Sequence, residues 1–223
     1  MKNNRFKIYP SILTADLAQL ENQISTAQDN GIDGFHIDIM DGQFVPPITF
    51  GPIIVSHIRK ITQLPIDIHM MVINPDRFFE DLIIAGADSI TIHYESTKNF
   101  DETLDKLKDL NVECSIAINP ETKLTDVQNY LNEINQILIM SVNPGYGGQK
   151  FIPSSIKKIK STKSIINNSN LKTKIQVDGG INSNTIDSVL QAGADIVVAG
   201  SAIYNDDNDI KTSIKTLKDS ISK

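Results

Sequence analysis

Four side chains that can bind a metal or move a proton lie in three short apolar segments. His36 and Asp38 are two residues apart in the first segment, His69 lies in the second, and Asp178 ends the third. Imidazole nitrogens and carboxylate oxygens without a thiolate suit Zn, Fe(II), Mn or Co, and do not choose strongly among them. Carboxyl groups also serve as general acids and bases. These residue types predict one divalent metal ion with acid–base chemistry beside it.

The spacing of these residues predicts which of them share a face. Successive side chains of a strand point to opposite faces, so His36 lies on the same face as Asp38. Asp67 shares a face with His69 in the same way. Because a buried, ionised carboxylate needs a partner or a metal, we interpret Asp67 as a residue that orients a ligand. For His93 a purely structural role is at least as well supported.

A second group of candidate residues is rich in glycine and follows three later apolar segments. Glycine occupies three of the four positions 145–148, Gly179 and Gly180 follow the next segment, and Gly200 and Ser201 follow the last. Glycines let backbone N–H groups approach an anion closely, and α/β barrels frequently bind phosphate with the loops after strands seven and eight. We therefore predict a phosphate site, with the loop at 145–148 as a candidate lid.

Elements that could position these residues recur along the whole chain. Short runs rich in Ile and Val alternate with longer amphipathic stretches, which is typical of parallel strands buried on both faces. The strand starts lie about 27 residues apart, which is enough for a strand and a crossover helix. The predicted strands are Phe6–Leu13, Gly34–Met40, Ile66–Val72, Ser89–Tyr94, Glu113–Ile118, Ile137–Val142, Lys174–Asp178 and Ile196–Ala199.

Eight such pairs predict an α/β fold, a single (β/α)8 TIM barrel that takes residues 1–223 as one domain. No long linker rich in Ser, Gly or Pro interrupts the pattern. The main alternative is an open doubly wound sheet, which should carry G-x-G-x-x-G after its first strand. The segment 11–16 reads Ser-Ile-Leu-Thr-Ala-Asp instead. In a barrel the chemistry lies at the carboxyl ends of the strands, where the residues above are found.

A short sequence pattern also recurs before some of the predicted strands. Ala85–Asp88 and Ala192–Asp195 both read Ala-Gly-Ala-Asp, and Gly-Ile-Asp at 31–33 is similar. A glycine that ends a helix is common before any strand, and a duplicated half-barrel would produce the same echo. The sequence leaves both explanations open.

The composition limits the classes of partner and compartment. Of the 223 residues 40% are hydrophobic and 22% charged, and 21 Lys+Arg against 27 Asp+Glu give a net charge of −6. Such a surface repels nucleic acid and anionic membranes, so we expect neither as a partner. The single cysteine, Cys114, cannot form an internal disulfide, which favours a reducing compartment. Without a run of 18 apolar residues or a signal-like start, a cytoplasmic location is expected.

Longer motifs connect these residues to a known family. The chain closely resembles the ribulose-phosphate 3-epimerase family of the pentose phosphate pathway from Ser11-Ile12-Leu13 onward. The motifs are HIDIMDGQFVPPITFG (36–51), DIHMMV (67–72), VNPGYGGQ (142–149), VDGGI (177–181) and AGSAIY (199–204). HIDIMDGQFVP and VNPGYGGQ are the specific ones. Pro47 and Met70 depart from the usual pattern, and bear on local loop shape rather than on the reaction.

The resemblance implies roles for individual residues. His36, Asp38, His69 and Asp178 match the family's four metal ligands, and Asp38 and Asp178 match its acid–base pair. The matching substrate and phosphate contacts are Ser11, His69, Gly145, Tyr146, Gly147, Gly148, Asp178, Gly179, Gly180, Gly200 and Ser201. A small phosphorylated ketose is then the expected substrate, and a homo-oligomer the expected assembly.

The implied reaction interconverts D-ribulose 5-phosphate and D-xylulose 5-phosphate. Inverting a carbon next to a ketone requires that a proton leave one face and return to the other, so two acid–base groups must flank a planar intermediate. Asp38 and Asp178 would be these groups and would exchange roles with the direction of reaction. The metal would stabilise the cis-enediolate between them.

The same scaffold could carry three other functions. An epimerase of a six-carbon ketose phosphate, such as allulose 6-phosphate, is disfavoured because such relatives have a larger residue in the Gly147-Gly148 and Gly179-Gly180 pairs. A decarboxylase or aldolase would carry Asp-x-Lys on the third strand, where this chain has Asp-Ile-His at 67–69. A non-catalytic sugar-phosphate-binding barrel would not need two aspartates and two histidines.

Overall fold

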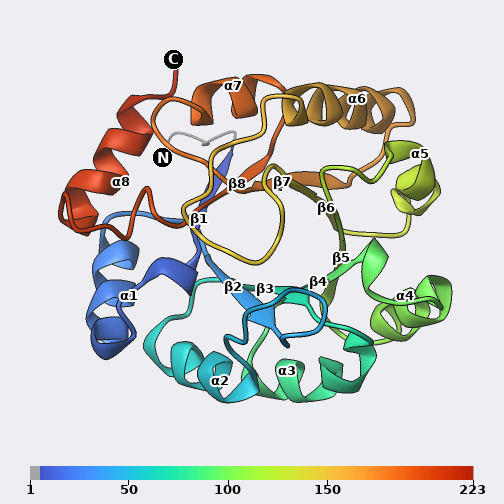
Figure 1. Ribbon diagram of the computed structural model, residues 1–223, viewed down its shortest axis with the longest axis horizontal. Helices are drawn as coiled ribbons and strands as arrows, with labels where there is room; N and C mark the ends of the chain where they lie inside the picture. The colour runs from blue at the N-terminus through green and yellow to red at the C-terminus, as the bar shows by residue number, and fades with distance from the viewer. Residues whose placement is uncertain (1–5, 223) are drawn as a thin grey trace.

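The computed structural model describes residues 6–222, and these form a ring of eight strands surrounded by eight α-helices (Figure 1). The strands are β1 (Lys7–Pro10), β2 (Phe35–Met40), β3 (Ile66–Met71), β4 (Ser89–His93), β5 (Glu113–Ile118), β6 (Gln136–Met140), β7 (Lys174–Asp178) and β8 (Ile196–Ala199). The helices are α1 (Leu20–Asp29), α2 (Pro52–Ile61), α3 (Phe79–Ala85), α4 (Phe100–Lys108), α5 (Leu124–Val127), α6 (Ser155–Asn168), α7 (Ile186–Gln191) and α8 (Ile210–Asp219). Short 3-10 helices are η1 (Ile12–Thr14), η2 (Leu17–Gln19), η3 (Pro75–Phe78), η4 (Tyr94–Ser96) and η5 (Gln128–Tyr130).

The eight strands form one parallel sheet whose two edges meet. Their order is β1-β8-β7-β6-β5-β4-β3-β2. Between β1 and β2 the ladder is reduced to a bridge between Ser11 and His36, and the amide of Asp33 donates to the carbonyl of Ile8 at 3.0 Å. The sheet is therefore a nearly closed (β/α)8 barrel, as the sequence predicted, and the open doubly wound sheet is excluded.

Alternation along the strands separates two environments. On β2 the residues Phe35, Ile37 and Ile39 join the apolar core between the sheet and the helices. The intervening residues His36 and Asp38 lie inside the barrel, where they are also buried. Burying each large apolar side chain contributes about 1.5–3 kcal/mol, so this outer layer of isoleucine and valine stabilises the barrel. The barrel interior is left free to carry polar groups.

The recurring glycine–aspartate pattern has a local structural cause. Gly86 and Gly193 end α3 and α7 with φ of 106° and 113°, a backbone conformation that favours glycine. An oxygen of a side chain just before each even-numbered strand then accepts from the N–H of the preceding strand, at 2.8–2.9 Å. These pairs are Asp33 with Ile8, Asp88 with Ile66, Asn135 with Cys114 and Asp195 with Ile175. These contacts account for the recurring sequence pattern and do not require a duplicated half-barrel.

The predicted strand bounds agree with the structure to within two residues, except at the end of the first strand. The prediction continued to Leu13, but β1 ends at Pro10. The Ser11 hydroxyl accepts from the amide of Leu13 at 3.3 Å and caps η1, so the chain turns across the mouth of the barrel. Among the described residues, no helix combines the length and the apolar character needed to span a membrane.

Candidate active site and metal centre

The four predicted metal ligands lie together inside the barrel, near the carboxyl ends of three strands. β2 carries His36 and Asp38, β3 carries His69, and Asp178 ends β7. One ligand atom from each lies within 4.8 Å of all the others. The Asp38 Oδ1 atom is 2.9 Å from His69 Nδ1 and 3.4 Å from His36 Nε2. The Asp178 Oδ2 atom is 4.0 Å from the same His36 nitrogen and 3.9 Å from His69 Nδ1.

The state of His36 fits a metal ligand. Its Nε2 atom is buried and has no hydrogen-bond partner among residues 6–222, which is costly for a polar atom. Its other ring nitrogen, Nδ1, lies 2.7 Å from the carboxylate of Asp67. With a proton on Nδ1, the free electron pair of Nε2 is directed into the cluster. Two imidazole nitrogens and two carboxylate oxygens make a donor set suited to one divalent cation.

Asp67 lies below the cluster in the barrel interior and is fully hydrogen-bonded. Besides His36, its oxygens accept from Ser89 Oγ at 2.5 Å, Gln136 Nε2 at 3.1 Å and Gln176 Nε2 at 2.6 Å. Although burial alone would raise it, these donors lower the pKa of Asp67, His36 first among them. A carboxylate on the Nδ1 atom of a metal-binding imidazole is a common way to orient the ring, and the position of Asp67 agrees with the role expected from the sequence.

The pKa values of the two aspartates of the cluster are shifted in opposite directions. Burial, together with the charge of Asp38, raises the pKa of Asp178 to about 7. For Asp38 burial acts in the same sense, but His36 and then His69 overcome it and hold its pKa well below the usual range. One carboxyl group is thus ionised at neutral pH while the other retains a proton for part of the time. Pairs of this kind commonly divide into a base and an acid.

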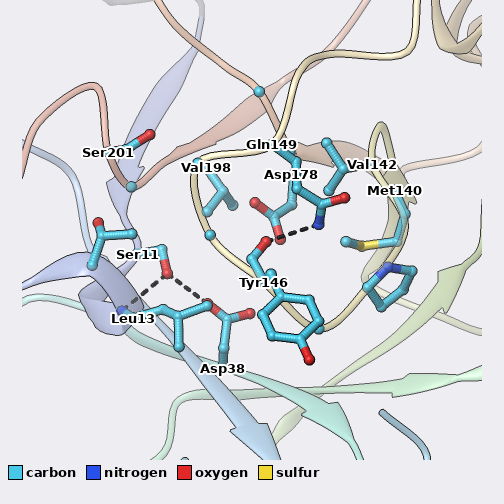
Figure 2. Close-up of a pocket in the computed structure, with 18 of the residues that line it drawn as sticks. Ser11, Leu13, Asp38, Met140, Val142, Tyr146, Gln149, Asp178, Val198 and Ser201 are labelled. Atoms are coloured by element: carbon cyan, nitrogen blue, oxygen red, sulfur yellow. Dashed lines mark hydrogen bonds between the residues drawn. The ribbon is translucent and has the colours of Figure 1, made fainter. Parts of the chain in front are cut away.

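A pocket opens above the cluster at the mouth of the barrel (Figure 2). Asp38 and Asp178 both line it, and Figure 2 shows them on different sides of the cavity. His69 is fully buried and belongs to the cluster beneath. The other residues predicted to contact substrate all line the pocket: Ser11, Gly145, Tyr146, Gly147, Gly148, Gly179, Gly180, Gly200 and Ser201. Met40, Met71 and Met140 complete its apolar wall.

Ser11 connects the pocket wall to the cluster. Its hydroxyl donates to Asp38 Oδ2 at 2.5 Å, as Figure 2 shows. The other oxygen of Asp38 faces the two imidazoles. Asp38 therefore has one oxygen directed to the cluster and one directed to the pocket, which a group that both binds metal and moves a proton requires.

The loop between β6 and α6 crosses the mouth of the barrel (Figure 1). Gln149 Nε2 donates to the carbonyls of Asn143 at 2.7 Å and Tyr146 at 2.9 Å, which holds the loop in a tight turn. A Cβ atom on Gly147 would lie 2.7 Å from the Thr14 side chain, so glycine allows the loop to pack closely on η1.

The two departures from the family pattern lie in different places. A Cβ atom on Gly145 would lie 3.7 Å from Pro47, so this proline packs beside the loop that crosses the mouth. Met70 is fully buried in the core between the barrel and the helices. Pro47 thus bears on the shape of the mouth, and Met70 does not reach the site.

Two residues next to the cluster, His93 and Glu95, were not predicted as functional. For His93 the sequence supported a structural role at least as well, and it did not single out Glu95. His93, at the end of β4, lies with its Nε2 atom 2.8 Å from His69 Nε2. Its Nδ1 atom is 3.1 Å from Glu95 Oε2. The sequence contained a signal, because His93 and Glu95 follow the strand next to the one that carries His69.

Comparison with solved structures supports the fold. KGPDC from Streptococcus mutans superposes with a TM-score of 0.71 at 15% identity, with 97% of each chain covered. A tryptophan synthase alpha-subunit from Pyrococcus furiosus gives a TM-score of 0.68 at 18% identity, with 96% of this chain and 98% of that one covered. At these identities the likeness concerns the barrel alone.

Comparison of sequences is more specific. The ribulose-phosphate 3 epimerase family matches residues 7–204. A ribulose-phosphate 3-epimerase from Bacillus subtilis is 41% identical over 215 residues, which cover 96% of this chain and 99% of the relative. The enzyme of that name from Methanocaldococcus jannaschii is 43% identical, with 96% and 90% covered. The chloroplastic ribulose-5-phosphate-3-epimerase of Arabidopsis thaliana is 40% identical, with 95% and 75% covered.

The fold, the paired carboxyl groups and these relatives define an α/β-barrel enzyme, an epimerase within the carbohydrate isomerases. The chain belongs to the ribulose-phosphate 3-epimerase family, as its motifs indicated.

Proposed function

We propose that the protein interconverts D-ribulose 5-phosphate and D-xylulose 5-phosphate by two-base proton transfer. The observation that carries the proposal is the meeting of Asp38 and Asp178, from β2 and β7, at one cluster that borders the pocket. Relatives at about 40% identity that carry the name of this reaction support the choice of substrate. The substrate would be a small phosphorylated ketose in the pocket of Figure 2.

Asp38 and Asp178 would act on opposite faces of carbon 3. Ionised Asp38 takes the proton from one face through Oδ2, the oxygen that the Ser11 hydroxyl also contacts. Asp178, on the other side of the pocket, returns one to the other face. In the reverse direction the two groups exchange roles. Neither group alone inverts the carbon, because a single carboxyl group tends to return the proton to the side from which it came.

His36, Asp38, His69 and Asp178 would hold one divalent cation, Zn, Fe(II), Mn or Co. When bound, the cation supplies Lewis-acid stabilisation for the negative charge of the enediolate. Asp67 keeps His36 in the tautomer with a free Nε2 atom, and Asp38 Oδ1 lies 2.9 Å from Nδ1 of His69, the other imidazole of the cluster.

The glycine-rich loops after β6, β7 and β8 would bind the phosphate and so orient carbon 3 between the two aspartates. Gly179 and Gly180 have φ of 114° and 65°, and a Cβ atom on Gly180 would lie 2.4 Å from the amide nitrogen of Phe151. No side chain fits there, which leaves backbone exposed to an anion. A comparison of kcat/KM for ribulose 5-phosphate and allulose 6-phosphate tests the pentose assignment against the hexose alternative. The homo-oligomeric state and the cytoplasmic location stay predictions.

The proposal is tested with Asp38→Asn and Asp178→Asn. Each variant is loaded with metal, its metal content is measured, and the entry of solvent deuterium at carbon 3 of ribulose 5-phosphate is followed by NMR. We expect epimerisation to fall by about 10²–10⁴-fold in both, because each lacks one acid–base group. Asp126→Asn, on α5, is the matched control and should retain full activity. Unchanged epimerisation in either active-site variant at full metal occupancy would refute the two-base assignment.

A further inference from the structure

His69 is held from behind by a hydrogen-bonded chain that the proposed proton transfer does not use. Its Nε2 atom lies 2.8 Å from His93 Nε2, and His93 Nδ1 lies 3.1 Å from Glu95 Oε2. The two rings are stacked, with centroids 4.9 Å apart and planes inclined by 29°. Both histidines are fully buried. The chain leads from the metal cluster through β3 and β4 to the segment that follows β4.

The order of donors and acceptors in this chain is determined from its outer end. A carboxylate accepts hydrogen bonds and donates none, so Glu95 requires a proton on His93 Nδ1. A neutral imidazole with a proton on Nδ1 has a free electron pair on Nε2. His93 Nε2 therefore accepts, and His69 Nε2 must be the donor. In the metal-loaded site the remaining nitrogen of His69, Nδ1, then carries no proton, and this is the atom that faces the cluster, 2.9 Å from the other expected ligand atom, Asp38 Oδ1.

Glu95 is itself held in place by the loop between β5 and α5. Its Oε1 atom accepts from the amide of Asn119 at 2.9 Å and from the hydroxyl of Thr122. The ammonium group of Lys158, on α6, donates to the carbonyls of Asn119, Pro120 and Thr122 at 2.9, 2.8 and 2.7 Å. Donors surround both oxygens of Glu95, so a carboxylate can accept from all of them. The NH2 group of an amide in the same place would meet another donor.

We propose that His93 and Glu95 are positioning residues that fix His69 in the tautomer whose Nδ1 atom can bind the metal. The inference rests on the metal centre of the proposed function and adds two residues to it. A carboxylate then fixes the tautomer of each imidazole ligand. Asp67 acts on His36 directly, and Glu95 acts on His69 through His93. Outer partners of this kind typically contribute 10–100-fold to metal affinity.

The variant Glu95→Gln changes this chain with little change in volume. If the amide nitrogen faces Asn119, two donors meet. If it faces His93 instead, His93 must accept on Nδ1 and donate from Nε2, which would place the proton of His69 on Nδ1. The first arrangement displaces the side chain that holds His93 and the second opposes metal binding directly, so we expect zinc affinity to fall about 10–100-fold. The control is Thr91→Val, which removes from β4, the strand of His93, a buried hydroxyl that makes no hydrogen bond among residues 6–222.

Two measurements test the inference. Competition with a chromophoric chelator gives the zinc affinity of the unchanged protein and of both variants, and circular dichroism of the metal-free forms checks folding. Long-range ¹H–¹⁵N spectra of the zinc-loaded unchanged protein report the tautomers directly, and with only four histidines in the chain the signals can be assigned from a His93→Gln variant. We expect His69 to carry its proton on Nε2 and His93 on Nδ1.

The outcomes separate this inference from the function on which it rests. Failure of the unchanged protein to bind zinc, Fe(II), Mn or Co would overturn the metal centre and the inference together. Metal binding with the proton of His69 on Nδ1, or that of His93 on Nε2, would overturn the inference alone. So would equal zinc affinities for a folded Glu95→Gln variant and the Thr91→Val control.

Discussion

Asp38 and Asp178 are the same chemical group in two environments a few ångströms apart. His36 and His69 lie beside one oxygen of Asp38 and favour its charged form, and the Ser11 hydroxyl donates to the other oxygen. Asp178 ends β7 with 17% of its side chain exposed, and burial and the charge of Asp38 disfavour its own charge. The difference in environment gives two identical side chains the different proton occupancies that a base and an acid need.

The raised pKa of Asp178 predicts a stability change in the metal-free protein. Its pKa of about 7 in the fold lies above its ordinary value of 3.8, so the neutral form is the stabilising one. This contribution is complete below about pH 4 and is lost as the pH rises through 7. An asparagine side chain cannot ionise, so at pH 8 we expect the free energy of unfolding of Asp178→Asn to be higher than that of the unchanged protein, by on the order of a few kcal/mol. At pH 4 we expect no gain.

Urea unfolding of both metal-free proteins from pH 4 to 8 measures this difference. Asp126→Asn, an exposed aspartate on α5, controls for the loss of one charge. A difference in unfolding free energy that does not grow between pH 4 and 8 would contradict the expected pKa.

At the scale of elements, loops and strand ends determine the shape of the pocket. Ser11 caps η1, the β6–α6 loop crosses to Thr14, and Gly179 and Gly180 turn the chain after β7. Each contact is close because a glycine or a short side chain stands there. The mouth of the barrel is therefore built from backbone, which suits recognition of a phosphate by amide groups.

Gly180→Ala tests this view of the loops. The substitution places a Cβ atom on a backbone with φ of 65° and 2.4 Å from the nitrogen of Phe151, so the loop must move. We expect a loss of about 1–3 kcal/mol in unfolding free energy and at least a tenfold rise in KM for ribulose 5-phosphate. Gly51→Ala is the control, because φ there is −160° and no atom lies within 4 Å of the new Cβ atom. Equal effects of the two substitutions would show that the loop after β7 is not constrained in this way.

At the scale of the whole molecule, one buried carboxylate connects the barrel wall to the proposed metal centre. Asp67, on β3, accepts hydrogen bonds from side chains on β2, β4, β6 and β7. These strands come from distant parts of the chain, and Gln176 is 109 residues from Asp67. The same carboxylate orients His36. Stability of the barrel and affinity for metal should therefore change together.

Asp67→Asn is expected to lower both quantities. The amide nitrogen must face at least one of the donors Ser89, Gln136 or Gln176, and the charge that favours a proton on His36 Nδ1 is lost. Disrupting a buried charged network costs about 3–5 kcal/mol, and loss of an orienting partner lowers metal affinity about 10–100-fold. Thermal melting with and without zinc measures both effects, because a ligand that binds the folded state raises Tm. A variant with normal melting and a normal rise in Tm on addition of zinc would contradict the coupling.

The local pattern of the sequence was sufficient to predict the strands, their faces and the cluster. Side-chain alternation has a period of two residues, so His36 with Asp38 and Asp67 with His69 could be assigned to common faces without tertiary information. In a parallel barrel all carboxyl ends of strands lie at one end, which brings Asp178 to the same place. These properties depend on neighbouring residues and on chain topology alone.

Only the tertiary structure decided how the site is hydrogen-bonded and charged. The chain from His69 through His93 to Glu95, and the attachment of Glu95 to Asn119, join residues on different strands and loops that no periodicity relates. The opposite pKa shifts of Asp38 and Asp178 likewise depend on burial and on charges within a few ångströms. Local periodicity determines which way a side chain points, whereas its partners and its pKa depend on what the folded barrel places opposite it.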